Sequence, residues 1–138
     1  MIEEGLITMN ISEVAAKYDM TPATIRYYES QGLMPAITRN QSGTRDFQEE
    51  DLNWVEFIKC MRDSGLSIHS LSKYSELYQI GEQTLTQRKE ILLDEYQKLL
   101  KKQALINGTV AKLEKKIANY DVKIKKYEEE IVTEKELG

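Results

Sequence analysis

A long apolar repeat runs through the C-terminal part of the sequence and limits what the rest can be. Between residues 84 and 131, apolar side chains recur in alternating steps of four and three, the heptad pattern of a coiled coil. The seam consists of Leu92, Tyr96, Leu99, Ile106, Val110, Leu113, Ile117, Tyr120, Ile124, Tyr127 and Ile131, with the polar Gln103 at one position. The other positions are mostly charged or polar, and a helix of this length measures roughly 70 Å. Because such a helix cannot bury its seam alone, the pattern predicts a partner helix.

The segment from Met20 to Leu33 reads as a short helix whose two ends are encoded locally. Thr21 can cap the N-terminus with its side-chain oxygen. Pro22 is tolerated at the first helical position, because a backbone N–H there would have no acceptor within the helix. Gly32 can adopt the left-handed conformation that commonly ends a helix. The sequence therefore predicts a helix between the threonine and the glycine.

Another helix is predicted directly before it, over residues 11–18. Asn10 and Glu13 have the spacing of a capping box, and the apolar residues that follow keep a helical period. Two short helices joined by a tight turn form a helix-turn-helix, in which the second helix carries the polar contacts. On that second helix lie Thr24, Arg26, Tyr27 and Tyr28. Their cation and hydroxyl groups can reach phosphates and base edges, so we expect them to contact double-stranded DNA.

A turn-forming cluster follows at residues 40–43, between short runs with extended character at 37–39 and 44–47. This pattern predicts a small β-hairpin with Arg39 on one side of the tip and Arg45 on the other. Such a wing can press both arginines against the sugar-phosphate backbone. The alternative is an ordinary solvated hairpin.

Two further helices complete the N-terminal part, one from Glu49 to about Asp63 and one after Ser67, with a break at Gly81. The expected fold is therefore mainly α. A winged helix-turn-helix with two packing helices forms a DNA-binding domain over residues 1–80. A dimerisation helix with a short tail follows over residues 81–138.

Composition narrows the cellular setting. The sequence has no apolar run long enough to span a membrane, and the first ten residues carry Glu3 and Glu4, unlike a secretory signal. A single cysteine, Cys60, fits a reducing cytoplasm. The net charge is −4, but residues 21–45 hold three arginines against one glutamate, a local charge of +2. A basic edge on an acidic body can dock on DNA in one orientation.

Enzymatic and metal chemistry find no support in the sequence. It contains no Gly-rich phosphate loop, no supported carboxylate pair and no nucleophile–base constellation. Cys60 and His69 alone cannot complete a tetrahedral metal site, and residues 81–138 contain neither cysteine nor histidine. We therefore expect a protein that is not an enzyme and that uses no metal or cofactor.

This layout resembles the MerR family of bacterial transcription regulators. The resemblance is carried by the residues from Thr24 to Glu29, by Gly32-Leu33, by Arg39 with the run from Gly43 to Phe47, and by Gly65 to Ile68. It covers about residues 9–80, and the heptad helix extends it to about 131. The run from Trp54 to Arg62 is most similar to the thiol-containing, aldehyde- and electrophile-responsive branch, the AdhR and NmlR type.

The resemblance implies a homodimer whose long helices pair antiparallel. Each recognition helix then enters a major groove of promoter DNA and each wing, with Gly43, Arg39 and Arg45, touches the flanking backbone. The activated dimer bends and untwists the promoter spacer so that RNA polymerase can engage it, which is indirect readout of DNA deformability.

The branch resemblance makes Cys60 the candidate sensor of a small reactive signal. Residue chemistry alone favours a small buried side chain, because a cysteine on an apolar helix usually packs. A sensor needs a lowered pKa and access, for which Lys59 and Arg62 are adjacent cations. Two alternatives stay open: a repressor or architectural protein that needs no effector and in which Cys60 is structural, and a coiled-coil scaffold.

Overall fold

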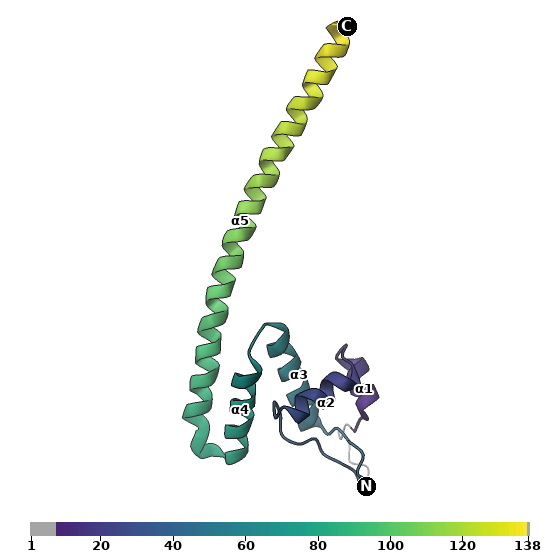
Figure 1. The fold of residues 1–138 in the computed structure, drawn as a ribbon, viewed down its shortest axis with the longest axis vertical. Helices are drawn as coiled ribbons and strands as arrows, with labels where there is room; N and C mark the ends of the chain where they lie inside the picture. Colours follow the sequence, from purple (N-terminus) through teal and green to yellow (C-terminus); the bar gives the residue numbers. More distant parts are fainter. Residues whose placement is uncertain (1–7, 138) are drawn as a thin grey trace. The chain divides into compact units, whose positions relative to one another are not determined.

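The structure, a computed structural model, describes residues 8–137 and is mainly helical, as predicted (Figure 1). Its elements are α1 (Ile11–Lys17), α2 (Pro22–Ser30), α3 (Glu49–Asp63), α4 (Ile68–Ile80), the 3-10 turn η1 (Glu82–Thr84) and α5 (Leu85–Leu137). One compact unit ends at Glu95 and a second begins at Tyr96. Glu3 and Glu4, which bear on the expected absence of a secretory signal, lie outside the described residues.

The local signals for the first two helices are confirmed. The Asn10 side chain accepts from the backbone N–H of Glu13, and the Glu13 side chain accepts from that of Asn10, so the capping box is complete. Thr21 caps α2 by accepting the backbone N–H of Thr24 at 3.1 Å. Gly32 adopts a φ of 72°, the left-handed conformation that ends the helix.

The core of the first unit is built from every element up to α4. α1 and α2 pack on each other. The buried apolar side chains include Val14 and Ala15 of α1, Ile25 of α2, Leu33 and Phe47 between α2 and α3, Val55 and Ile58 of α3, and Leu71 and Leu77 of α4. Burial of this set fixes which face of α2 is left for solvent.

The corner between α4 and α5 is held by polar side chains. Thr84 is buried, and its Oγ1 lies 2.7 Å from the carbonyl oxygens of both Leu77 and Gly81. Arg88 donates from Nε to that same Thr84 oxygen at 3.0 Å. Gly81 itself has a φ of 126°, at the predicted junction between residues 80 and 81. The division into a DNA-binding domain and a dimerisation helix stays a prediction.

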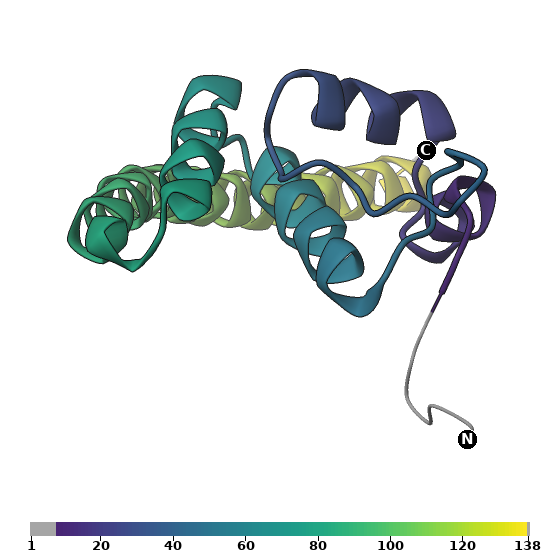
Figure 2. The same cartoon turned by 90° about the horizontal axis from the view of Figure 1, so that it is seen from below.

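The β-hairpin predicted over residues 37–47 is not formed as strands. Within residues 8–137 the structure has only two isolated antiparallel bridges, Arg39 with Arg45 and Met9 with Phe47. Figures 1 and 2 show the chain between α2 and α3 as an irregular segment. Phe47 pairs with Met9 through backbone bonds of 2.9 and 3.1 Å, so its run leaves the hairpin early.

The tip of this segment is nevertheless an ordered turn. Asn40 Oδ1 accepts the backbone N–H groups of both Ser42 and Thr44, and the Asn40 N–H donates to the Thr44 carbonyl at 2.9 Å. Gly43, with a φ of 82°, supplies the left-handed residue that the turn needs. We call residues 38–45 the wing segment.

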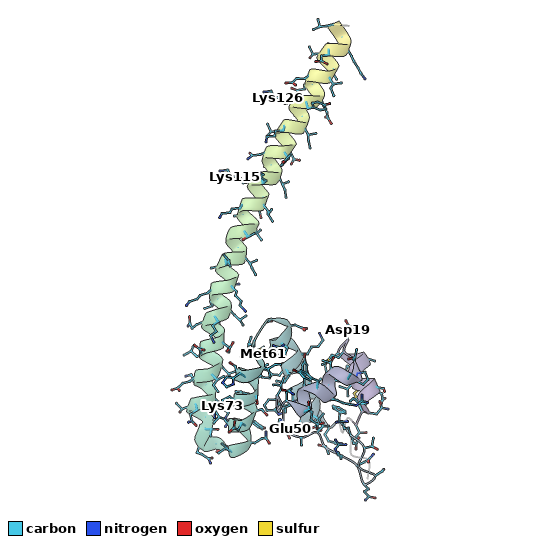
Figure 3. All side chains as sticks on the ribbon, in the orientation of Figure 1. Asp19, Glu50, Met61, Lys73, Lys115 and Lys126 are labelled. Atoms are coloured by element: carbon cyan, nitrogen blue, oxygen red, sulfur yellow. The ribbon has the colours of Figure 1, made fainter. Side chains whose placement is uncertain are left out.

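Helix α5 carries the heptad seam on its surface. Six seam side chains expose 46 to 59% of their area: Tyr96, Ile106, Val110, Leu113, Ile117 and Tyr120. Leu92 exposes 37%, and Leu99 is half-buried. Lys115 and Lys126 point away from the helix axis in Figure 3. Within residues 8–137, no helix combines the length and apolarity that crossing a membrane requires.

Candidate nucleic-acid interface

Helix α2 turns one apolar side chain inward and presents a cation and a phenol outward. Ile25 is fully buried, whereas Arg26 and Tyr27, which follow it directly, are exposed. Tyr27 leaves 47% of its area accessible. A guanidinium can donate two parallel hydrogen bonds to a guanine edge or to a phosphate, and a phenol can donate one. The exposed face of α2 is thus equipped to read DNA.

The other two α2 residues predicted to contact DNA are less available. The Thr24 hydroxyl lies 2.8 Å from the Thr21 hydroxyl at the helix N-terminus. Tyr28 is half-buried, its ring 6.2 Å from that of Tyr27, and it lines a hollow shared with Asp19, Thr24 and Lys59. The four side chains therefore do not form one uniform surface.

The two wing arginines differ sharply in their surroundings. Arg45 is 21% exposed, and its Nε and Nη2 lie 2.9 and 2.8 Å from Oε1 of Glu29 on α2. Arg39 is 46% exposed, donates from Nη1 to the Gly43 carbonyl at 2.8 Å, and lies 3.9 Å from the same glutamate. The sequence alone predicts the same role for both arginines, but in the structure they differ in exposure and in their hydrogen-bond partners.

Glu29 is the functional candidate that sequence reasoning missed. Besides Arg45, its carboxylate accepts the backbone N–H of Ile37 at 2.6 Å through Oε2. In the sequence it registers only as one negative charge among three arginines. The available signal was that mismatch, because an acidic side chain in a basic stretch expected to face DNA would repel phosphate unless it serves another purpose.

Cys60 lies exposed in the last turns of α3, which differs from the buried position that residue chemistry favours. Its two cationic neighbours point to other partners. Lys59 donates to Asp63 at 2.7 Å, a hydrogen bond that raises the pKa of the Lys59 ammonium. Arg62 donates to the Leu66 carbonyl at 2.6 Å. The thiol has the access that a sensor needs, while both neighbouring cations are engaged elsewhere.

An aromatic cluster joins α3 and α4. The rings of Trp54, Phe57, Tyr74 and Tyr78 lie with centroids 5.0 to 6.1 Å apart. With Glu50 they line an open pocket of about 240 Å³. The Tyr78 hydroxyl donates to Glu50 at 3.1 Å, and this hydrogen bond raises the pKa of the phenol. Packing between α3 and α4 accounts for these tyrosines.

A metal site has no counterpart in the described part of the chain. Across residues 8–137 no three histidine, cysteine, aspartate or glutamate side chains are grouped so that they could hold an ion. His69, at the start of α4, is exposed and lines a surface hollow with Lys73 and Glu90.

Comparisons with known proteins bear on the same region. The family described as MerR HTH family regulatory protein matches residues 9–77. The chain is 52% identical over 92 residues to the HTH-type transcriptional regulator AdhR of Bacillus subtilis, a match that covers 67% of this chain and 66% of that protein. The relatives compared are transcriptional regulators rather than enzymes.

Two solved structures extend the similarity to the fold. A protein from Listeria monocytogenes assigned to the MerR family superposes with a TM-score of 0.84 at 41% identity, covering 89% of this chain and 93% of that one. HiNmlR, described as a MerR family regulator lacking the sensor domain and bound to promoter DNA, superposes with a TM-score of 0.74 at 29% identity. That alignment covers 83% of this chain and 91% of HiNmlR.

Proposed function

The chain belongs to the MerR family of helix-turn-helix regulators, and from this premise we propose that it is a homodimer that binds promoter DNA and regulates transcription there. The observation that carries the proposal is the exposed pair Arg26 and Tyr27 on α2, the second helix of the helix-turn-helix. HiNmlR, of similar fold, was solved on promoter DNA. In this proposal α2 enters the major groove and the wing segment meets the adjoining backbone.

We rank the proposed DNA contacts by the exposure of their side chains. Arg26 and Tyr27 read base edges or phosphates from the centre of α2. Thr24 and Tyr28 contribute hydroxyl contacts from the half-buried side of the same helix, and Arg39 with Gly43 contacts the backbone from the wing. The modest positive charge of this region makes binding dependent on a few directed contacts rather than on bulk charge.

The proposed dimer pairs the α5 helices through the exposed heptad seam. An apolar stripe of this length left in water is unfavourable, by roughly 25 cal/mol for each Å² that a partner would cover. Gln103, the polar residue within the stripe, favours one register because it needs a polar neighbour there. Antiparallel pairing, which the family resemblance implies, relates the two recognition helices by a two-fold axis, the symmetry of a palindromic promoter site.

Regulation then acts through DNA shape, in the cytoplasm and together with RNA polymerase. Bending and untwisting a promoter spacer costs a few kcal/mol, which the dimer's contacts with the DNA must supply. A signal can switch transcription only if it favours the bent state over the unbent one.

The experiment that tests DNA recognition is selection from a random-sequence duplex pool by the full-length chain, followed by footprinting. We expect enrichment of a pseudo-palindrome with two protected half-sites separated by whole helical turns. Affinity should fall steeply as salt rises. Enrichment of no sequence at low salt would contradict the proposal.

For the signal, we propose that Cys60 senses a small aldehyde or other electrophile. Its exposed thiol supports this. Addition to an aldehyde forms one S–C bond while the thiol proton moves to the carbonyl oxygen, so no oxidant is needed. In an in vitro transcription assay on the promoter upstream of its own gene, we expect formaldehyde to change the transcript level when the wild-type protein is present. With Cys60→Ser present, formaldehyde should leave the transcript level unchanged. An equal response of both proteins would reassign Cys60 to structure.

The outcomes also separate the two alternatives. A protein that binds its duplex but answers no electrophile, with or without Cys60, is a repressor or architectural protein independent of an effector. A protein that dimerises without enriching any duplex is a coiled-coil scaffold, for which the exposed Arg26 and Tyr27 have no use.

A further inference from the structure

The Glu29 carboxylate links the recognition helix α2 to the wing segment through hydrogen bonds. We propose that Glu29 is a positioning residue that clamps the wing segment onto α2, that Arg45 is the strut of this clamp, and that Arg39 is the wing's phosphate-contacting arginine. This inference rests on the proposed DNA binding and deepens it by dividing the wing arginines into two roles.

The clamp uses both carboxylate oxygens. Oε1 of Glu29 accepts from Nε and Nη2 of Arg45 at 2.9 and 2.8 Å, and Oε2 accepts from the Ile37 backbone N–H at 2.6 Å. Hydrogen bonds between charged groups of this length are the strong ones in proteins. Ile37 is buried, so its amide is a fixed anchor at the start of the wing segment, while Arg45 holds the other end.

Burial distinguishes this clamp from an ordinary surface ion pair. The side chains of Glu29 and Arg45 are only 13% and 21% exposed. Exposed ion pairs contribute little to stability because water and salt screen the two charges. Both kinds of screening are weaker for this partly buried pair. Glu29 also lies in the last turn of α2, where the helix dipole disfavours a negative charge. The carboxylate is therefore held by its donors rather than by its helix.

The wing segment needs an external anchor because, beyond its ordered tip, its two sides share little backbone pairing. Its two sides share one isolated bridge, with Asn40 N–H donating to Thr44 at 2.9 Å and Asp46 N–H donating to Thr38 at 2.7 Å. A two-stranded ribbon of this size is marginal in water. Fixing it before DNA arrives reduces the entropy lost on binding. The clamp thus sets the spacing between the groove-reading helix and the backbone-reading wing.

The same bonds decide what each arginine can offer to DNA. Two nitrogens of Arg45 face Glu29, so its charge is largely matched inside the protein. Arg39 is 46% exposed and keeps only a 3.9 Å approach to that carboxylate. Its Nη1 bond to the Gly43 carbonyl holds the side chain along the wing. One of the two guanidinium charges is therefore left for phosphate.

The test compares four variants of the full-length chain on the duplex that the wild type enriches from a random pool. Removing a carboxylate near DNA should tighten binding if only charge matters. The clamp predicts the opposite: Glu29→Ala should weaken binding about tenfold or more through loss of a preorganised wing. Arg45→Lys should also weaken it, although the charge is kept, because the two-pronged contact is lost.

Salt dependence separates the strut from the phosphate contact. Arg39→Ala should lower the slope of log affinity against log salt by about 0.9 for each protomer. Arg45→Lys and Arg45→Ala should weaken binding without changing this slope. In the free protein, hydrogen exchange of the Ile37 amide should accelerate in Glu29→Ala and stay slow in Arg39→Ala. This readout does not depend on DNA.

Three results would overturn the clamp: tighter binding by Glu29→Ala, a slope lowered by Arg45→Ala as by Arg39→Ala, or unchanged Ile37 exchange in Glu29→Ala. Thermal unfolding monitors folding of each variant, and if Glu29→Ala fails to fold, Arg45→Lys carries the same comparison. Failure of the wild type to enrich any duplex would instead refute the proposed function. The two failures are thus distinguishable.

Discussion

Arg26→Ala is expected to lose sequence-specific DNA binding while it remains folded and dimeric. A bidentate arginine–base contact is worth about 1–3 kcal/mol, and a dimer makes it twice. The expected loss of affinity is therefore about 30-fold to roughly 20,000-fold. Fluorescence anisotropy with the selected duplex measures this loss, and sedimentation with circular dichroism verifies dimer and fold.

Two controls sharpen that expectation. Lys73→Ala removes an exposed cation from α4, outside the helix-turn-helix, and should bind the duplex as the wild type does. Arg26→Lys keeps the charge but not the fork, so it should lose selectivity more than non-specific affinity. If Arg26→Ala unfolded the protein, the residue would be structural. If Arg26→Ala and Lys73→Ala bound alike, α2 would not be the reading helix.

Ile117→Glu is expected to dissociate the dimer and, with it, to abolish tight DNA binding. Ile117 is a residue of the heptad seam and is 59% exposed on the single chain. In a paired seam it is covered, and two unpaired glutamates per dimer would be placed in an apolar contact. We expect a penalty of several kcal/mol, which raises the dimer dissociation constant by more than about 100-fold. Analytical ultracentrifugation over a concentration series measures it.

Val122→Glu is the matched control, because it introduces the same side chain five residues further along the same helix. Val122 is 69% exposed but lies on the face opposite the seam. The variant should therefore remain a dimer. Equal dissociation by both variants would show that the helix pairs through another face, and dissociation by neither would refute pairing through α5.

Helix boundaries could be predicted because they depend on neighbours in the sequence. The capping box of Asn10 and Glu13, the Thr21 cap with Pro22, and the left-handed Gly32 act within a few residues of one another. Such interactions are nearly independent of the rest of the fold. The periodic apolar positions then fixed the inward faces, and Ile25 is buried as the pattern requires.

The irregular form of the wing and the Glu29 clamp could not be predicted, because both depend on distant parts of the chain. Phe47 pairs with Met9, thirty-eight positions earlier, and this contact ends the hairpin before strands form. Glu29 and Arg45 are sixteen residues apart. Charge counting places both arginines in one class, and only the carboxylate between the elements separates them.

The exposure of Cys60 illustrates a third limit. It lies between the buried Ile58 and the half-buried Met61, and neighbours of this kind suggested a packed side chain. A helix turns about 100° at each residue, so two positions after a buried residue the side chain points to the opposite side. Assigning the face from the period rather than from the neighbours' character would have placed the thiol outside.

If the proposed dimer pairs through the seam of α5, the composition of that seam bears on which subunits can pair. Gln103 interrupts an otherwise apolar stripe that also carries Tyr96 and Tyr120. A subunit with a purely aliphatic seam would leave the side-chain amide of Gln103 without a polar neighbour. Its side chains would also pack poorly against the rings of Tyr96 and Tyr120. In the proposed dimer, pairing with such a subunit is therefore less favourable than pairing with a second copy of this chain.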